Sequence, residues 1–87
     1  MSKDLQSLRA EIDCLDKQLW EIIAQRMDIA REIGEWKYTH GEPVLQSNRY
    51  QQVLDQCLQS AREKGISEDA VREVMEALHK ESVRVQS

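Results

Sequence analysis

The stretch that decides the fold covers residues 4–38 and reads DLQSLRAEIDCLDKQLWEIIAQRMDIAREIGEWKY. Its apolar residues are separated mostly by alternating steps of three and four: Leu5, Leu8, Ile12, Leu15, Leu19, Ile22, Ile29, Ile33 and Trp36. This spacing predicts one long helix with a coiled-coil-like apolar stripe. At 1.5 Å per residue, such a helix is roughly 50 Å long. A chain of 87 residues is too small to cover this rod, so we expect a partner chain to pack against it.

Two shorter helices are predicted to follow. Gly41 and Pro43 end the first helix within residues 39–46. Ser47 is the predicted N-cap of the second helix, which ends at Lys64-Gly65. Ser67 is the predicted N-cap of the third. Their apolar faces are Val53, Leu54, Cys57, Leu58 and Ala61 in the second and Val71, Val74, Met75 and Leu78 in the third. No strand-like alternation appears, and the predicted fold class is all-α.

The composition restricts the class of protein. The length allows a single domain, residues 1–87, and the net charge of −4 argues against nucleic acid or an anionic membrane as the main partner. The N-terminus has no apolar signal-peptide core. Cys14 and Cys57 follow no metal-binding spacing. We therefore expect a cytoplasmic protein.

Arg26 occupies a position of the apolar stripe where an aliphatic residue is expected. A guanidinium there is costly unless an anion meets it, which an interhelical ion pair or a bound ligand would provide. Lys37 lies eleven residues later and therefore on the same face; alternatively, it is a solvated lysine that complements the helix dipole. Gly34 lies between them, and its missing side chain could leave room for a ligand.

The stripe of the third helix continues into two polar residues, Ser82 and Gln86. Either the stripe frays into water, or these groups face a small anionic ligand together with Arg26 and Lys37. Arg9 lies roughly 25 Å from Arg26 along a straight helix, so one small anion cannot contact both in a single chain. An antiparallel partner could bring its Arg9 to the Arg26 end, although a surface arginine is the simpler interpretation.

Several kinds of catalytic site have no sequence pattern here. The chain contains no identifiable Ser-His-Asp arrangement, metal-ligand cluster or glycine-rich phosphate loop. An enzyme of this sequence would work by binding and electrostatics, without a covalent nucleophile, metal or cofactor.

Four segments resemble the all-helical chorismate mutases: LRAEIDCLDKQLWEIIAQR (residues 8–26), REIGEWK (31–37), PVLQSNRY (43–50) and ESVRVQ (81–86). The residues in register are Arg9, Arg26, Lys37, Pro43, Val44, Arg49, Ser82 and Gln86. The resemblance implies an intertwined homodimer with two sites, each completed by Arg9 of the other chain. It also implies conversion of chorismate to prephenate by an intramolecular [3,3] rearrangement.

The resemblance also implies roles for individual residues. Arg26 and the other chain's Arg9 would bind the two carboxylates, while Lys37 and Gln86 would donate to the ether oxygen. Ser82 would assist at a carboxylate, and Arg49 would organise the pocket from behind the substrate-contacting groups without taking part in the chemistry. Apolar walls would come from Ile33, Val53 and Val83.

Three positions depart from the family pattern. Tyr50 replaces a glutamate that binds the substrate's ring hydroxyl, Gln46 replaces an acidic residue, and His79 replaces an aliphatic wall residue. Isochorismate-pyruvate lyase activity on the same fold is therefore an alternative. A further alternative is a non-catalytic regulatory or dimerisation module of a fused shikimate-pathway enzyme, since the chain ends one residue after Gln86.

Overall fold

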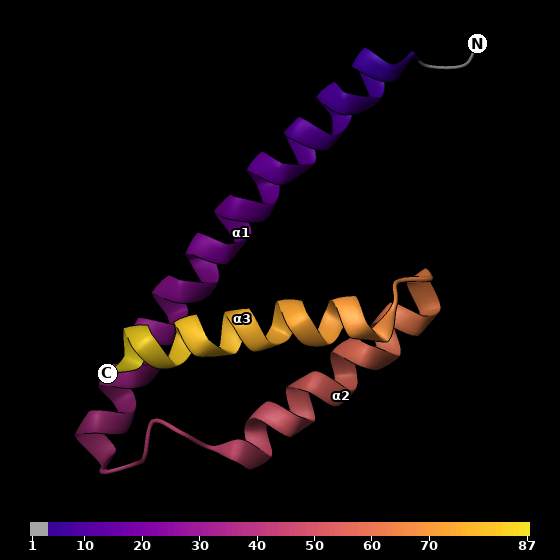
Figure 1. The fold of residues 1–87 in the computed structure, drawn as a ribbon. Helices are drawn as coiled ribbons and strands as arrows, with labels where there is room; N and C mark the ends of the chain where they lie inside the picture. Colours follow the sequence, from indigo (N-terminus) through magenta and orange to yellow (C-terminus); the bar gives the residue numbers. More distant parts are fainter. Residues whose placement is uncertain (1–3) are drawn as a thin grey trace.

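The computed structural model describes residues 4–87 and contains three helices. Helix α1 is Leu5–His40, α2 is Ser47–Lys64 and α3 is Glu68–Gln86 (Figure 1). Within this described part no strand is present. The predicted all-α class is confirmed, and α1 extends two residues beyond the predicted end. None of the helices in residues 4–87 combines the length and the apolar character that crossing a membrane requires.

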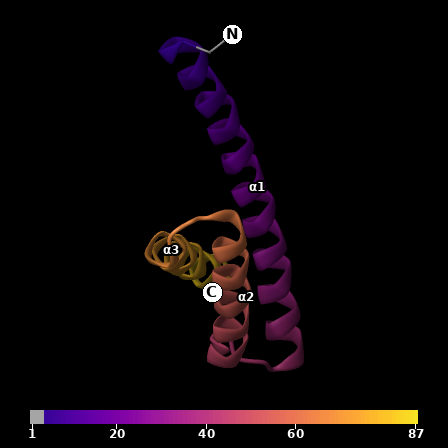
Figure 2. The same cartoon turned by 90° about the vertical axis from the view of Figure 1, so that its right-hand side faces the viewer.

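The helices form an elongated molecule of 58 × 24 × 15 Å. Helices α2 and α3 make an antiparallel hairpin, and α3 returns to pack against the C-terminal half of α1 (Figures 1 and 2). The N-terminal half of α1 extends beyond this hairpin (Figure 2). This arrangement brings the C-terminal ends of α1 and α3 together.

The helix ends follow from local chemistry. The Asp4 carboxylate caps α1 by accepting a hydrogen bond from the Ser7 amide at 2.8 Å, which lowers the pKa of Asp4 below its ordinary value. Gly41 ends α1 in the left-handed conformation at φ 68°, which glycine adopts readily. Ser67 caps α3 by accepting from the Ala70 amide at 3.2 Å, as predicted.

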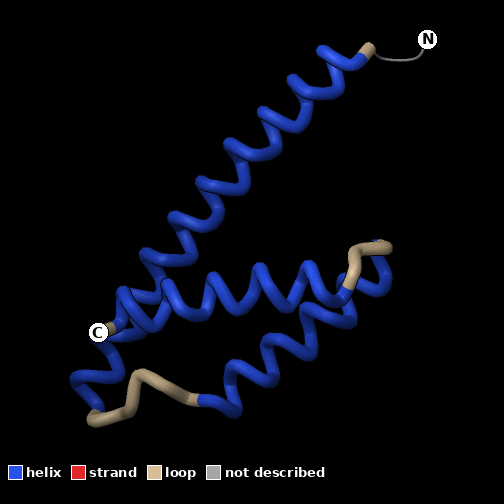
Figure 3. The backbone as a smooth tube through the Cα atoms, viewed as in Figure 1, coloured by secondary structure: helices blue, strands red, loops and turns tan. Residues whose placement is uncertain are grey.

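The predicted N-cap of α2 is wrong. Ser47 is the first helical residue, and Gln46 occupies the cap position without a side-chain hydrogen bond to the helix. The loop that follows Pro43 enters α2 at Gln46, so the helix begins one residue earlier than predicted (Figure 3). As predicted, α2 ends at Lys64, with Gly65 at φ 72°.

The chain buries only a small core, formed mainly between α2 and α3. Leu54, Leu58 and Met75 form its buried cluster, while α1 contributes Met27 and Ala30 on the face that meets α3. All the stripe residues of α1, from Leu5 to Trp36, remain exposed; Leu15, for example, is 60% exposed. A large apolar surface of this kind is typical of an interface.

Candidate active site

A polar contact forms where the last turns of α1 and α3 meet. The Lys37 ammonium donates to Gln86 Oε1 at 2.7 Å and to the backbone carbonyl of Val44 at 2.8 Å. Lys37 therefore connects α1, α3 and the loop after α1. Because the amide oxygen of Gln86 is turned toward Lys37, its Nε2 is left as a donor for another group.

Gly34 makes this contact possible. A Cβ at position 34 would lie 2.8 Å from the Cα of Gln86 and 2.9 Å from its carbonyl oxygen. The expectation that Gly34 leaves room for a ligand is therefore wrong, because the backbone of α3 fills that space. Glycine is needed here so that α3 can approach α1 closely enough for Gln86 to meet Lys37.

Gly34→Ala is expected to displace the last turn of α3, because the clash is with backbone atoms. Misplacing a catalytic group by about 1 Å can reduce the rate about 100-fold, and we expect a loss of up to this size. The rate of substrate conversion and the helical content from circular dichroism should be measured together. A fully active variant would show that the close approach of the two helices is not required.

Arg26 makes the second polar contact between α1 and α3. Its Nη1 donates to Ser82 Oγ at 2.5 Å. Ser82 is buried, with 8% of its surface exposed, so the stripe of α3 does not fray into water here. The group that Arg26 meets is a neutral hydroxyl and not the acid that an interhelical ion pair requires. The remaining N–H groups of this half-buried guanidinium are therefore left for an anion.

A cavity of about 100 Å³ opens beside the Lys37–Gln86 contact. Six of the residues predicted for the site line it: Lys37, Arg49, Tyr50, Val53, Val83 and Gln86. Arg49 is exposed and donates to Gln52 Oε1 at 3.0 Å. The Tyr50 ring stacks on that of His79, with centroids 4.1 Å apart and an interplanar angle of 28°.

Four predicted site residues do not line this cavity. Arg26 and Ser82 form their own contact one turn of α3 away from Gln86. Ile33 is 44% exposed on the apolar stripe of α1. Arg9 is exposed in the N-terminal half of α1, where α3 does not reach. The prediction that one chain cannot bring Arg9 to its own Arg26 agrees with this geometry.

Comparison with known proteins places this sequence in a family. The model of the family described as chorismate mutase type II matches residues 8–87, which include every predicted site residue. The chain belongs to the chorismate mutase type II family.

Relatives of this chain differ in length and name. The 4-amino-4-deoxychorismate mutase of Streptomyces venezuelae is 32% identical over 83 residues, which are 95% of this chain and 81% of that protein. The chorismate mutase of Methanocaldococcus jannaschii is 26% identical over 69 residues, 79% of this chain and 70% of that protein. The T-protein of Haemophilus influenzae is 33% identical over 78 residues, 90% of this chain. The chain spans only about a fifth of the T-protein, 21% of its length.

Three cavity-lining residues were not predicted as part of the chorismate mutase site: Val44, Gln46 and His79. Val44 contributes its backbone carbonyl, which no side-chain pattern reveals. Gln46 and His79 stood out in the sequence only as departures from the family pattern. The helical spacing of His79, Val83 and Gln86 is a signal that could have found His79, because steps of four and three place all three on one face of α3.

Proposed function

We propose that this protein converts chorismate to prephenate. The observation that carries the proposal is the Lys37–Gln86 contact at the edge of the cavity. It holds an ammonium and an amide N–H donor close together, where both can reach one oxygen atom of a bound substrate.

The proposed reaction needs these donors and no general base. The ether C–O bond breaks while a C–C bond forms within one molecule, so no proton is transferred in the rearrangement. Negative charge grows on the ether oxygen in the transition state, and Lys37 and Gln86 Nε2 stabilise it there. Arg26 binds a carboxylate and holds the substrate in the pseudo-diaxial conformer that reacts.

We also propose that the functional molecule is a homodimer. The cavity of about 100 Å³ is smaller than the roughly 300 Å³ of the smallest typical ligand sites, so one chain encloses only part of a site. The exposed stripe of α1 is one apolar surface without a partner in residues 4–87. A groove of about 480 Å³ between α2 and α3 is another, lined by Cys57, Ala61, Ile66, Val71, Val74 and Met75.

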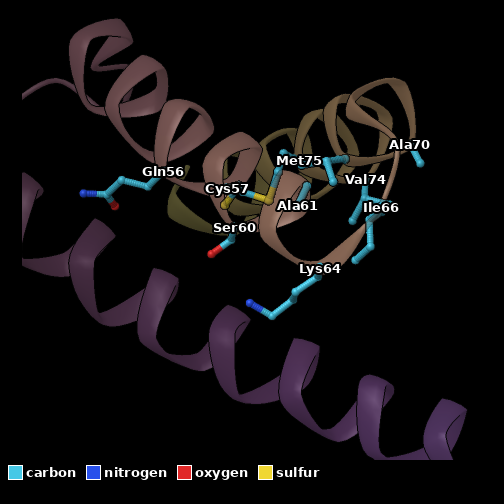
Figure 4. A pocket seen from close by; sticks show the side chains of 10 residues that line it. Gln56, Cys57, Ser60, Ala61, Lys64, Ile66, Ala70, Val74 and Met75 are labelled. Carbon is cyan, nitrogen blue, oxygen red and sulfur yellow. The ribbon is translucent and has the colours of Figure 1, made fainter.

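The apolar stripe of α1 and the apolar groove between α2 and α3 are complementary surfaces. The polar side chains of Gln56, Ser60 and Lys64 project from one side of α2 at the rim of this groove, and apolar side chains form its floor (Figure 4). An amphipathic helix with one apolar stripe fits such a groove, and α1 is a helix of this kind. The N-terminal half of α1 from the second chain would then cover the hairpin and bring its Arg9 toward the first chain's Arg26.

Mixing inactive subunits tests the shared site. In a heterodimer of Arg9→Ala and Arg26→Ala chains, one of the two sites keeps both arginines. Random exchange between the chains is therefore expected to restore about a quarter of the wild-type activity. Each variant alone should stay near its own low activity. If mixing restores nothing although heterodimers are detected by mass spectrometry, the arginines act within single chains.

The reaction itself is tested by identifying products. The protein is incubated separately with chorismate and with isochorismate, and the products are determined by nuclear magnetic resonance. We expect prephenate from chorismate. Pyruvate and salicylate from isochorismate, with no prephenate from chorismate, would show the lyase activity instead. No turnover of either compound by the folded dimer would favour a non-catalytic module.

A further inference from the structure

The stacked rings of Tyr50 and His79 join α2 to α3 beside the cavity. Both residues are half-buried, and both line the cavity. Neither the Tyr50 hydroxyl nor the His79 imidazole has a hydrogen-bond partner within residues 4–87. The stack fixes both rings, so their polar atoms are held in place and are left for a bound molecule.

The charges around this pair have one sign. Lys37 and Arg49 are the charged residues that line the cavity, and both are cationic. The described lining contains no carboxylate; Glu42, the acid of the adjoining loop, lines a neighbouring surface depression that shares Gln46 and Arg49 with the cavity. Arg26 of α1 adds a third cation near the cavity, because it contacts Ser82, one turn of α3 before Gln86. The stack therefore provides hydrogen-bonding groups without a carboxylate in a site whose charged side chains are cationic.

This combination distinguishes two closely related substituents on a substrate ring. A hydroxyl is neutral and can exchange hydrogen bonds with the phenol and the imidazole. An aliphatic amine is mostly protonated at neutral pH, and an ammonium would face the two cations with no carboxylate to pair with it. Attraction of the ammonium to the aromatic faces is limited, because each ring covers one face of the other.

We propose that the Tyr50–His79 pair, in a cavity without a carboxylate, makes this enzyme select a ring-hydroxyl substrate over its ring-amine analogue. The inference rests on the proposed mutase activity. It separates this chain from its Streptomyces venezuelae relative, which is named for an amino-substituted substrate. His79 and Tyr50 thereby become specificity-determining residues and take no part in the bond changes.

The test compares kcat/KM for chorismate and for 4-amino-4-deoxychorismate. The wild-type dimer is expected to favour chorismate by about tenfold or more. A like charge a few ångströms away disfavours the charged form of a group, here the ammonium of the amine analogue, by about a factor of ten or more. Tyr50→Glu adds a carboxylate and should move the ratio about tenfold toward the amine, whereas the matched neutral variant Tyr50→Gln should not. His79→Glu and His79→Gln repeat the comparison from α3 in case changes at position 50 disturb folding.

The outcomes separate this inference from the proposed function. A wild-type ratio near one, or a ratio that favours the amine, would overturn the selectivity. The same ratio in the Glu and Gln variants at both positions would overturn the role of charge. Turnover of neither compound by the folded wild-type dimer would overturn the proposed mutase activity, and the inference with it.

Discussion

Replacing Lys37 with alanine is expected to lower kcat about 100- to 1,000-fold, the usual effect of removing one donor aimed at developing charge. The ammonium is a charged donor in a half-buried position, where electrostatic interactions are stronger than in water. The substitution also removes the hydrogen bonds to Val44 and Gln86. Gln86 would then lose the contact that turns its Nε2 toward the substrate. Steady-state kinetics with chorismate measures the loss.

Lys80→Ala is the matched control for Lys37→Ala. Lys80 lies on the exposed surface of α3 and forms an ion pair with Glu76. Such surface pairs contribute little to stability, so this variant should behave like the wild type. If Lys37→Ala keeps more than about a tenth of the wild-type kcat while the protein stays folded, the ammonium does not stabilise the transition state as proposed.

Arg26→Ala is expected to lower kcat/KM about 100- to 1,000-fold. The guanidinium is proposed to bind a substrate carboxylate through two charge-assisted hydrogen bonds, each of which contributes about 1.5–3 kcal/mol. The loss should raise KM and lower kcat, because the same contact binds the substrate and holds its reactive conformer. Arg26→Lys should recover only part of the activity, since an ammonium lacks the planar fork of N–H groups.

A second effect of Arg26→Ala concerns stability. Ser82 Oγ loses its donor in a buried position and keeps only the weak hydrogen bond that its hydroxyl donates to Met27 Sδ at 3.9 Å, and a buried acceptor left without a donor costs about 1–3 kcal/mol. Thermal unfolding of Arg26→Ala and of the Arg26→Ala/Ser82→Ala double variant separates this cost from the catalytic one. Arg31→Ala is the control, because Arg31 pairs with Asp28 on the exposed surface. Equal kinetic losses in the Arg26 and Arg31 variants would contradict the proposed role.

Much of the fold could be predicted from the sequence, because the strongest signals are local. The stripe from Leu5 to Trp36 and the glycines at 41 and 65 determine where α1 and α2 lie and end. The cap of α2 was predicted one residue too late, since Ser47 is a good capping residue but the loop enters the helix before it. Local chemistry cannot show this, because the direction of the loop depends on how Lys37 holds the Val44 carbonyl.

The site was predictable only in part. Arg26, Lys37, Ser82 and Gln86 stood out as polar residues on apolar stripes, and the structure joins them in two pairs. The pairing itself depends on how closely α3 approaches α1, so Gly34 was misinterpreted from its position alone. The Tyr50–His79 stack depends on the register between α2 and α3, which no periodicity within either helix contains.

The central claim is that Lys37 and Gln86 donate together to the ether oxygen of the substrate. It is tested most directly by a crystal structure of the protein with a bicyclic dicarboxylate whose bridging ether oxygen mimics the transition state. We predict that this oxygen lies about 2.7–3.1 Å from both Lys37 Nζ and Gln86 Nε2, with the Arg26 guanidinium on a carboxylate. An ether oxygen directed toward Tyr50 and His79 or toward bulk water, with both nitrogens beyond hydrogen-bonding distance, would contradict the mechanism.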